Sequence, residues 1–365
     1  MSSTPHLWQG EWIGDDELEQ RVSTLGSALA QNLQEPLLAD TVLDACELMS
    51  NAITARDATL LPEILAVEDA ATLDELAAFL LRSNLNEKIR RELAAGEARQ
   101  MPFRMERLGA VDAIFEAWRP LGFLVHIAPT NAANVPFLSV IEGLLTGNVN
   151  FLKTGGSDSL YPQLCLQRLI RCDRRAQVAR YIYAARISSK KQSLLKSVLA
   201  QADGVAVWGN EEAIEGIRAL APAHSRMIGW GPKISFAYIE NALSSDASVL
   251  EGLAREVCFL EQQACSSPQV IYLDSANPTE ISELAARLAL ALDKVSPTFQ
   301  RKAPSGPEQA EITQLKLLTQ REAALDSHPA GPTVIEATDG SRRIFLDGKP
   351  GLRATPLYRT VSVKG

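Results

Sequence analysis

Strand patterns and helical patterns alternate along the middle of the chain, and this alternation constrains the fold most strongly. Residues 120–127 read as an apolar strand of the kind that is buried on both faces of a parallel sheet, and 149–152 and 205–208 repeat the pattern. Helical patterns, such as those over 136–145 and 160–170, lie between the strands. Because neighbouring parallel strands need a crossover connection, the alternation predicts a doubly wound α/β domain.

The composition fits a globular protein of about two domains. The chain has 365 residues, 46% of them hydrophobic and 22% charged, which is enough to bury a core. A formal net charge of -8 argues against a nucleic-acid partner, because phosphate binding needs an excess of basic residues. Residues 1–10 show no secretory leader pattern, and no run reaches the ~18 apolar residues of a membrane span. We therefore expect a cytoplasmic protein with no membrane span.

The five cysteines lack the spacing of a zinc site or a disulfide framework, so we predict no metal centre. Cys265 stands at the end of a predicted helix, before a predicted strand over 270–273, in the run Gln262-Gln263-Ala264-Cys265-Ser266-Ser267-Pro268-Gln269. A thiol near helix ends and backbone amides can become a reactive thiolate, whereas an ordinary buried cysteine only fills apolar space. Cys265 is the candidate nucleophile. The other cysteines lie on predicted helical faces and are expected to be core residues: Cys46, Cys165, Cys172 and Cys258.

Three stretches resemble the aldehyde dehydrogenase superfamily and, within it, the fatty acyl-CoA reductases that make aldehyde for bacterial luminescence. They are residues 120–148, which include the loop Ala128-Pro129-Thr130-Asn131, residues 203–209, and the run around Cys265. The run around Cys265 is the most specific of the three. The likeness extends from about Pro120 to the end of the chain.

The resemblance implies an α/β fold of the aldehyde dehydrogenase type, with a doubly wound, Rossmann-type cofactor domain and a second α/β catalytic domain. Residues 1–100 read as a helical lead-in packed on the cofactor domain, and 101–119 as an extended segment and candidate oligomerisation arm. We place the dinucleotide-binding domain at 120–241 and the catalytic domain at 242–365. The chain stops within a predicted strand at 357–365, whereas family members continue, so the resemblance implies a C-terminally truncated catalytic domain.

The resemblance also implies roles for individual catalytic residues. Cys265 would carry the acyl group, and Asn131 with the backbone N–H of Cys265 would donate hydrogen bonds to the oxyanion. Asn131 has the alternative of merely stabilising its turn. Gly229 stands where oxidising members carry the glutamate that activates water, and the loss of that base favours acyl reduction. His224 is a candidate acid or base, with a structural histidine as the alternative.

The cofactor site has no GxGxxG or Walker pattern, which agrees with the different cofactor binding of the superfamily. Lys153 matches the lysine that reaches the adenosine ribose. Gly155, Gly156 and Ser157 offer backbone amides at a predicted helix start, which suits a phosphate. The alternative for the glycines is an ordinary turn between a strand and a helix.

Two further features of this site concern the rest of the cofactor. Trp208, Gly209 and Asn210 match the turn beneath the nicotinamide or the pyrophosphate, with a core aromatic at a strand end as the alternative for Trp208. Gly156 stands where NAD-preferring members often carry an acid. With no carboxylate there to repel a 2'-phosphate, and with Lys153 close by in sequence, we predict NADPH as the cofactor.

These inferences predict an acylating reductase that converts a fatty acyl thioester, such as an acyl-CoA, into an aldehyde with NADPH. One alternative is a reductase of another activated acyl group, such as an acyl phosphate. A second alternative is a truncated, non-catalytic scaffold partner of an acyl-activating protein. For the full-length protein we expect a homo-oligomer.

Overall fold

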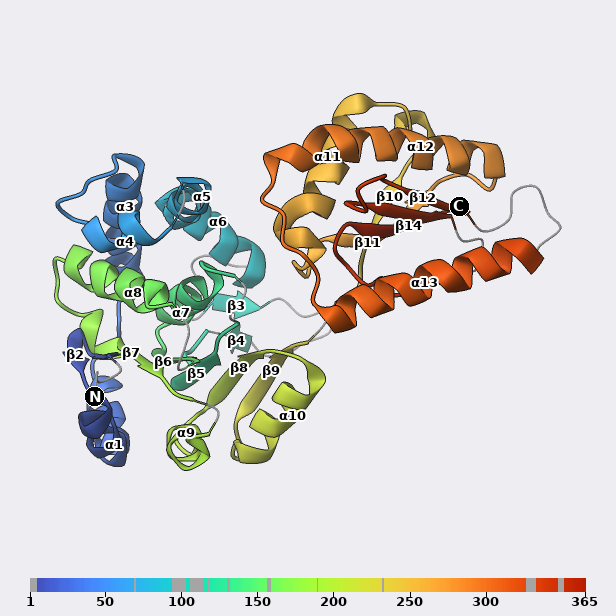
Figure 1. The fold of residues 1–365 in the computed structure, drawn as a ribbon. Helices are drawn as coiled ribbons and strands as arrows, with labels where there is room; N and C mark the ends of the chain where they lie inside the picture. The colour runs from blue at the N-terminus through green and yellow to red at the C-terminus, as the bar shows by residue number, and fades with distance from the viewer. Residues whose placement is uncertain are drawn as a thin grey trace. The chain divides into compact units, whose positions relative to one another are not determined.

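The computed structural model describes residues 5–68, 70–93, 103–105, 114–116, 118–129, 132–155, 159–188, 190–231, 233–325, 333–346 and 351–365. The chain divides into two compact units, Met1–Gly231 and Pro232–Gly365 (Figure 1). The predicted boundary after residue 241 falls inside the second unit. The reason is that β10 (Ser235–Ile239) pairs with β11 (Pro268–Leu273) and so belongs to the second sheet.

A seven-stranded sheet forms the centre of the first unit, in the spatial order β2-β1-β7-β6-β5-β8-β9. Its strands are β1 (His6–Trp8), β2 (Glu11–Ile13), β5 (Phe123–Ile127), β6 (Val149–Thr154), β7 (Ile182–Arg186), β8 (Gly204–Trp208) and β9 (Arg226–Trp230). The chain runs from β5 outward to β6 and β7, then returns to the other side of β5 for β8 and β9, all in parallel. This order confirms the doubly wound fold and places its switch point between β5 and β8.

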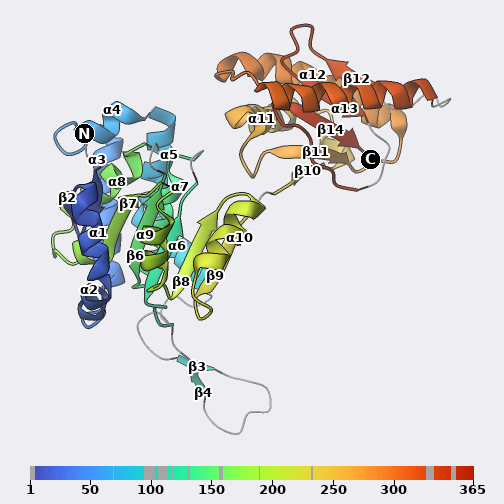
Figure 2. The same ribbon diagram turned by 60° about the horizontal axis from the view of Figure 1, so that its bottom comes forward.

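Helices cover both faces of this sheet. They are α1 (Asp15–Ser23), α2 (Leu25–Asn32), α3 (Ala39–Thr54), α4 (Pro62–Val67), α5 (Ala70–Leu80), α6 (Arg82–Leu93), α7 (Val135–Leu145), α8 (Tyr161–Cys172), η2 (Ala179–Tyr181), α9 (Gln192–Leu199) and α10 (Glu211–Leu220). Figures 1 and 2 show α7 and α8 on one face and α9 and α10 on the other. The apolar residues of the helical lead-in share one core with the sheet, so the lead-in belongs to the first unit. Within residues 101–119, β3 (Phe103–Met105) pairs antiparallel with β4 (Ile114–Glu116).

The second unit has a five-stranded sheet in the order β10-β11-β14-β13-β12. Its further elements are η3 (Asn241–Leu243), α11 (Ala247–Cys258), η4 (Phe259–Gln262), α12 (Pro278–Val295), η5 (Ser296–Thr298), α13 (Gly306–Leu325), β12 (Thr333–Glu336), β13 (Arg343–Leu346) and β14 (Thr360–Lys364). Figure 1 shows α11 and α12 on one face of this sheet and α13 on the other. β14 lies inside the sheet, paired in parallel with both β11 and β13.

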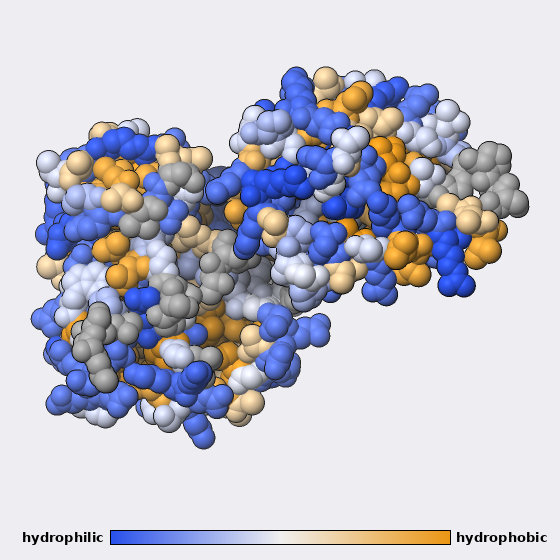
Figure 3. Space-filling view, in the orientation of Figure 1, coloured by the Kyte–Doolittle hydropathy of each residue, from blue (hydrophilic) through white to orange (hydrophobic). Residues whose placement is uncertain are grey.

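The surface in the view of Figure 3 is mostly hydrophilic, and apolar residues lie on it in small groups. Such scattered apolar exposure is normal for a folded protein. Among the residues that the structure describes, no helix has the length and apolarity to cross a membrane.

Candidate functional site

Cys265 lies on the loop between η4 and β11, and it is the exposed one of the five cysteines. The predicted helix up to Cys265 is wrong at its end, because α11 stops at Cys258. The backbone then passes through Leu260, Glu261 and Gln262, whose φ angles are 47°, 54° and 66°. These values lie in the left-handed region, which costs a non-glycine residue about 1–2 kcal/mol. Contacts elsewhere in the unit must therefore hold the loop in this form.

Gln262 supplies part of that support. It is fully buried, and its side-chain amide donates to the carbonyl oxygens of Pro268 at 2.8 Å and Thr360 at 3.0 Å. Its side-chain oxygen accepts from the backbone N–H of Thr360 at 2.8 Å. One amide thus ties the loop before Cys265 to the first residues of both β11 and β14. Buried amides with all these partners hold a backbone firmly, because losing any one leaves a desolvated polar group.

A second left-handed run faces the first. Leu357, Tyr358 and Arg359 have φ angles of 62°, 51° and 57°, and they directly precede β14. The two runs are joined by a backbone bond in which the N–H of Tyr358 donates to the carbonyl of Glu261 at 3.0 Å. An ion pair between Arg359 Nη2 and Glu261 Oε1 joins them again, and its side chains are only 1% and 7% exposed. Arg359 Nη1 also donates to the hydroxyl of Ser296.

The other side of the cysteine loop is tied to β10. The hydroxyl of Ser235 donates to the backbone carbonyl of Cys265 at 2.6 Å. The N–H of Ser267 donates to the carbonyl of Ala264 at 3.0 Å, so a tight turn carries the thiol at its tip. Sequence inspection missed Glu261 and Arg359 altogether. Gln262 stood within the motif around Cys265, but nothing in its spacing indicated that it would join two strands.

The remaining cysteines do not share this setting. Burial raises the pKa of the thiols of Cys46, Cys165, Cys172 and Cys258. A raised pKa keeps a thiol in its weakly nucleophilic, protonated form. This agrees with their predicted place in the core.

The candidate cofactor residues of the first unit lie at the carboxyl ends of its parallel strands. Lys153 is the penultimate residue of strand β6, Gly155 follows that strand, and Trp208 ends β8. The indole of Trp208 stacks on that of Trp230 at the end of β9, with ring centroids 6.1 Å apart and planes 11° apart. Trp230 is 51% exposed, so the pair presents a flat aromatic face to solvent. The sequence analysis missed Trp230, because the glycines around it read as a break between strands.

Asn210 stabilises the start of a helix. It is the N-cap of α10, and its side-chain oxygen accepts from the N–H of Ala213 at 2.9 Å. His224 lies at the opposite edge of the sheet, in an exposed turn before the first residue of β9. The register pairs Arg226 with Gly204 at that edge and Trp230 with Trp208 at the other. His224 therefore does not join the candidate cofactor residues.

Three of the predicted site residues lie outside the described residues: Asn131, Gly156 and Ser157. Near the first of them, Asn134 is buried and makes structural bonds. Its amide donates to the carbonyl of Thr72 at 3.0 Å, and its oxygen accepts from the hydroxyl of Tyr161 at 2.9 Å.

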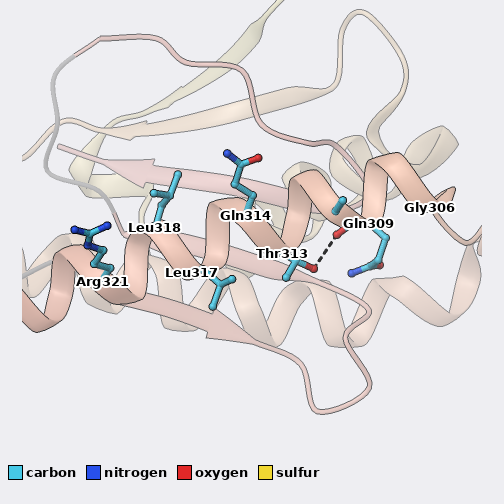
Figure 4. A pocket seen from close by; sticks show the side chains of 8 residues that line it. Gly306, Gln309, Thr313, Gln314, Leu317, Leu318 and Arg321 are labelled. Carbon is cyan, nitrogen blue, oxygen red and sulfur yellow. Dashed lines mark hydrogen bonds between the residues drawn. The ribbon is translucent and has the colours of Figure 1, made fainter.

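The second unit has two hollows on its surface. One, of about 640 Å³, runs along a single face of α13 and contains none of the predicted site residues (Figure 4). The other, of about 570 Å³, is lined by polar residues that include Asp293, Arg342 and Arg359. Only the second reaches a residue that contacts the cysteine loop, through Arg359.

Comparison with known families assigns the chain to one of them. Residues 34–365 match the family described as acyl-CoA reductase (LuxC). The chain belongs to this family. The family resemblance drawn from the three stretches at 120–148, 203–209 and around Cys265 is thereby confirmed.

Relatives within the acyl-CoA reductase family carry names that specify the acyl donor. The chain is 28% identical over 221 residues to long-chain acyl-protein thioester reductase 2 of Photobacterium leiognathi, covering 58% of this chain and 46% of the relative. It is 33% identical over 154 residues to the long-chain acyl-protein thioester reductase of Photorhabdus luminescens, covering 42% and 32%. The matched regions thus span about half or less of the length of these relatives.

Solved structures show the same fold at low sequence identity. An NAD-dependent benzaldehyde dehydrogenase from Corynebacterium glutamicum has a TM-score of 0.67 at 16% identity, covering 100% of this chain and 84% of that one. An NADP-dependent glyceraldehyde-3-phosphate dehydrogenase from Bacillus halodurans C-125 has a TM-score of 0.61 at 13% identity, covering 99% and 81%. The predicted aldehyde dehydrogenase fold is confirmed.

Proposed function

We propose that this protein reduces a fatty acyl thioester to an aldehyde through a thioacyl bond on Cys265. The observation that carries the proposal is the setting of that thiol: it is exposed at the tip of a turn, on a loop held by buried contacts. A nucleophile needs such a combination of access and fixed geometry. The names of the family relatives, which are reductases of acyl-protein thioesters, support the same substrate class.

In the proposed reaction the sulfur of Cys265 attacks the carbonyl carbon of the acyl thioester. A new S–C bond forms as Cys265 gives up its proton, and negative charge gathers on the carbonyl oxygen. The sulfur of the donor then leaves as a thiolate with the electron pair of the broken S–C bond and takes up a proton to become the free thiol. The backbone N–H of Cys265 and the amide of Asn131 are the proposed donors to the oxyanion, a contribution typically worth a few kcal/mol for each donor. The acyl group then remains on Cys265 as a thioester.

Protection of this thioester from water is the second requirement. By the resemblance, Gly229 stands where oxidising aldehyde dehydrogenases carry a water-activating glutamate, and glycine has no side chain to act as a base. Hydrolysis of the acyl group therefore lacks its usual catalyst at this position, and the acyl group is kept for reduction. We assign His224 no role in this scheme, because its turn lies at the edge of the first sheet opposite to the candidate cofactor residues.

A nicotinamide cofactor fits the carboxyl edge of the first sheet. The stacked indoles of Trp208 and Trp230 offer a flat apolar surface to a planar ring, and Lys153 offers a cation at the end of β6. We propose that Lys153 and the backbone amides of Gly155, Gly156 and Ser157 hold the adenosine phosphate end. When bound, the reduced nicotinamide supplies a hydride to the acyl carbon, and the aldehyde is released as the sulfur takes back its electron pair.

NADPH is the proposed form of the cofactor, since Gly156 cannot repel a 2'-phosphate. We expect kcat/KM for NADPH to exceed that for NADH by at least about tenfold, equivalent to about 1.4 kcal/mol. Replacing Lys153 by alanine should reduce this ratio, whereas Lys153→Arg should retain most of it. Equal kcat/KM for the two cofactors in the wild type would contradict the assignment.

The covalent step can be tested without any cofactor. The protein is mixed with a long-chain acyl-CoA, with an acyl group carried as a protein thioester, or with an acyl phosphate, and the intact mass is measured. We expect an acyl adduct from the thioesters, located on Cys265 by peptide mapping and absent in Cys265→Ala. Cys46→Ala serves as the control that should keep the adduct.

Each other outcome points to a different function. A rapid adduct from acyl phosphate and none from thioesters would assign the reaction to acyl phosphates. If no donor gives an adduct and no cofactor is oxidised, the result would favour the hypothesis of a non-catalytic scaffold.

A further inference from the structure

The two left-handed runs, at residues 260–262 and 357–359, depend on each other. We infer that Arg359 is a positioning residue for the nucleophile: its ion pair with Glu261 holds the loop that presents Cys265 in the orientation for acyl transfer. The inference rests on the proposed function for the identity of the reaction. It adds a residue to which none of the sequence patterns pointed, on a segment 98 residues away from Glu261 along the chain.

The first step of the argument is that neither run is stable by itself. All six residues are non-glycine and have positive φ angles between 47° and 66°. A residue with a β-carbon avoids this region unless tertiary contacts impose it, and such backbone conformations cluster at functional sites. The contacts that could impose it on residues 260–262 are therefore part of the site.

The second step is that these contacts converge from the other run. The backbone N–H of Tyr358 donates to the carbonyl of Glu261 at 3.0 Å, and the guanidinium of Arg359 donates to the Glu261 carboxylate. The Arg359 side chain is only 1% exposed, so its contacts are screened little by water. Its second anchor is the hydroxyl of Ser296, which follows α12. Arg359 thus fixes the loop before Cys265 against a separate element of the same unit.

The third step is that the residue lies within reach of a small molecule. Arg359 lines the hollow of about 570 Å³ described above, together with Arg342. Arg342 makes an ion pair comparable to that of Arg359: its Nε and Nη2 donate to the Asp293 carboxylate at 2.7 and 2.6 Å, and its side chain is 8% exposed. Both arginines are buried in the same unit, each is paired with a carboxylate, and both line the same hollow. Only the partner of Arg359 belongs to the cysteine loop.

Arg342 therefore serves as the matched control for Arg359. Arg359→Ala and Arg342→Ala are compared with the wild type in the rate at which Cys265 takes up an acyl group from acyl-CoA without cofactor, and in the rate at which iodoacetamide alkylates Cys265. The thermal unfolding midpoint is recorded for each protein. We expect Arg359→Ala to acylate about 10- to 100-fold more slowly, the loss typical of a displaced reacting group, and Arg342→Ala to stay within about threefold of wild type.

Chemical rescue separates positioning from a loss of folded protein. Methylguanidinium at millimolar concentration can enter the space left in Arg359→Ala from the hollow, and we expect it to restore at least about fivefold of the acylation rate while leaving Arg342→Ala unchanged. A variant that had merely lost stability would gain nothing, because guanidinium compounds weaken folded proteins.

Each remaining outcome decides the matter. Equal acylation rates in the two alanine variants at matched fractions of folded protein would overturn the inference. If Arg359→Ala does not fold, Arg359→Lys and Arg342→Lys replace the pair, and a slower acylation confined to Arg359→Lys is the supporting result. If wild-type protein takes up no acyl group, the proposed function fails, but the alkylation rates of the variants still test whether Arg359 positions Cys265.

Discussion

Acid should weaken the first unit through one buried histidine, His126 on β5. The ring lies between Ser139, whose hydroxyl is 2.6 Å from Nδ1, and Asn150, whose side-chain oxygen is 3.0 Å from Nε2. Both partners are neutral, and His126 is only 3% exposed. A proton on its ring would therefore place an unpaired charge in the core. Burial accordingly lowers the pKa of His126 from 6.5 to about 4.

The direction and the size of the effect follow from that shift. Above pH 6.5 the ring is neutral in both the folded and the unfolded chain, and the full stability is present. As the pH falls from 6.5 through about 4, the unfolded chain takes up the proton and the folded chain resists it, so stability is lost. The whole shift corresponds to about 3 kcal/mol, and about 2 kcal/mol of this should be lost by pH 5.

The tryptophans allow this to be measured on the first unit alone. All five of them, Trp8, Trp12, Trp118, Trp208 and Trp230, precede the division after Gly231. Urea unfolding followed by tryptophan fluorescence at pH 7 and pH 5 therefore reports this unit. His126→Gln is the matched variant, since it keeps a polar side chain but cannot titrate. Other titrating groups, including His6, whose pKa burial also lowers, are the same in both proteins.

The wild type should lose about 2 kcal/mol more than His126→Gln between pH 7 and pH 5. The variant starts from a lower stability at pH 7, because its amide cannot reproduce both ring contacts, so only the change with pH is compared. If the two proteins lose the same stability over this interval, the reasoning about a neutral, buried ring is refuted.

Three further predictions concern single residues. Under native conditions Ellman's reagent should modify Cys265 first and Cys46 only on unfolding, and equal rates for the two thiols would contradict their burial. Gly143→Ala should destabilise the first unit by about 1–3 kcal/mol in urea, because the added Cβ would lie 1.8 Å from the side-chain oxygen of Asn150; a gain in stability, the usual result inside a helix, would show that Asn150 moves freely. Asn210→Ala should lose about 1 kcal/mol in the same assay through its N-cap bond, and Asn210→Ser should restore it; a cofactor affinity that falls in both variants alike would instead indicate a direct contact with the ligand.

The sequence by itself determined the layered fold of the first unit and singled out the candidate nucleophile. Strand patterns such as 123–127 and 149–152, which lack a polar face, fit a sheet covered by helices on both sides, and the alternation with helices favours parallel, right-handed crossovers. The motif around Cys265 is a local string, so it could be found without coordinates. These features depend on residues that are close together in the chain, so they can be predicted from local sequence patterns.

Tertiary structure alone decided how the cysteine loop is held. The ion pair of Glu261 with Arg359 joins positions 98 residues apart, and no periodicity links them. Neither left-handed run contains a glycine, so the sequence gives no sign of their positive φ angles. Tertiary contacts, and not the intrinsic preference of these residues, impose this conformation. The same reason explains β9, whose glycine and tryptophan residues form a strand only because β8 offers its free edge. The tertiary structure also separated His224 from the candidate cofactor residues, because its turn precedes β9 at the opposite edge of the first sheet.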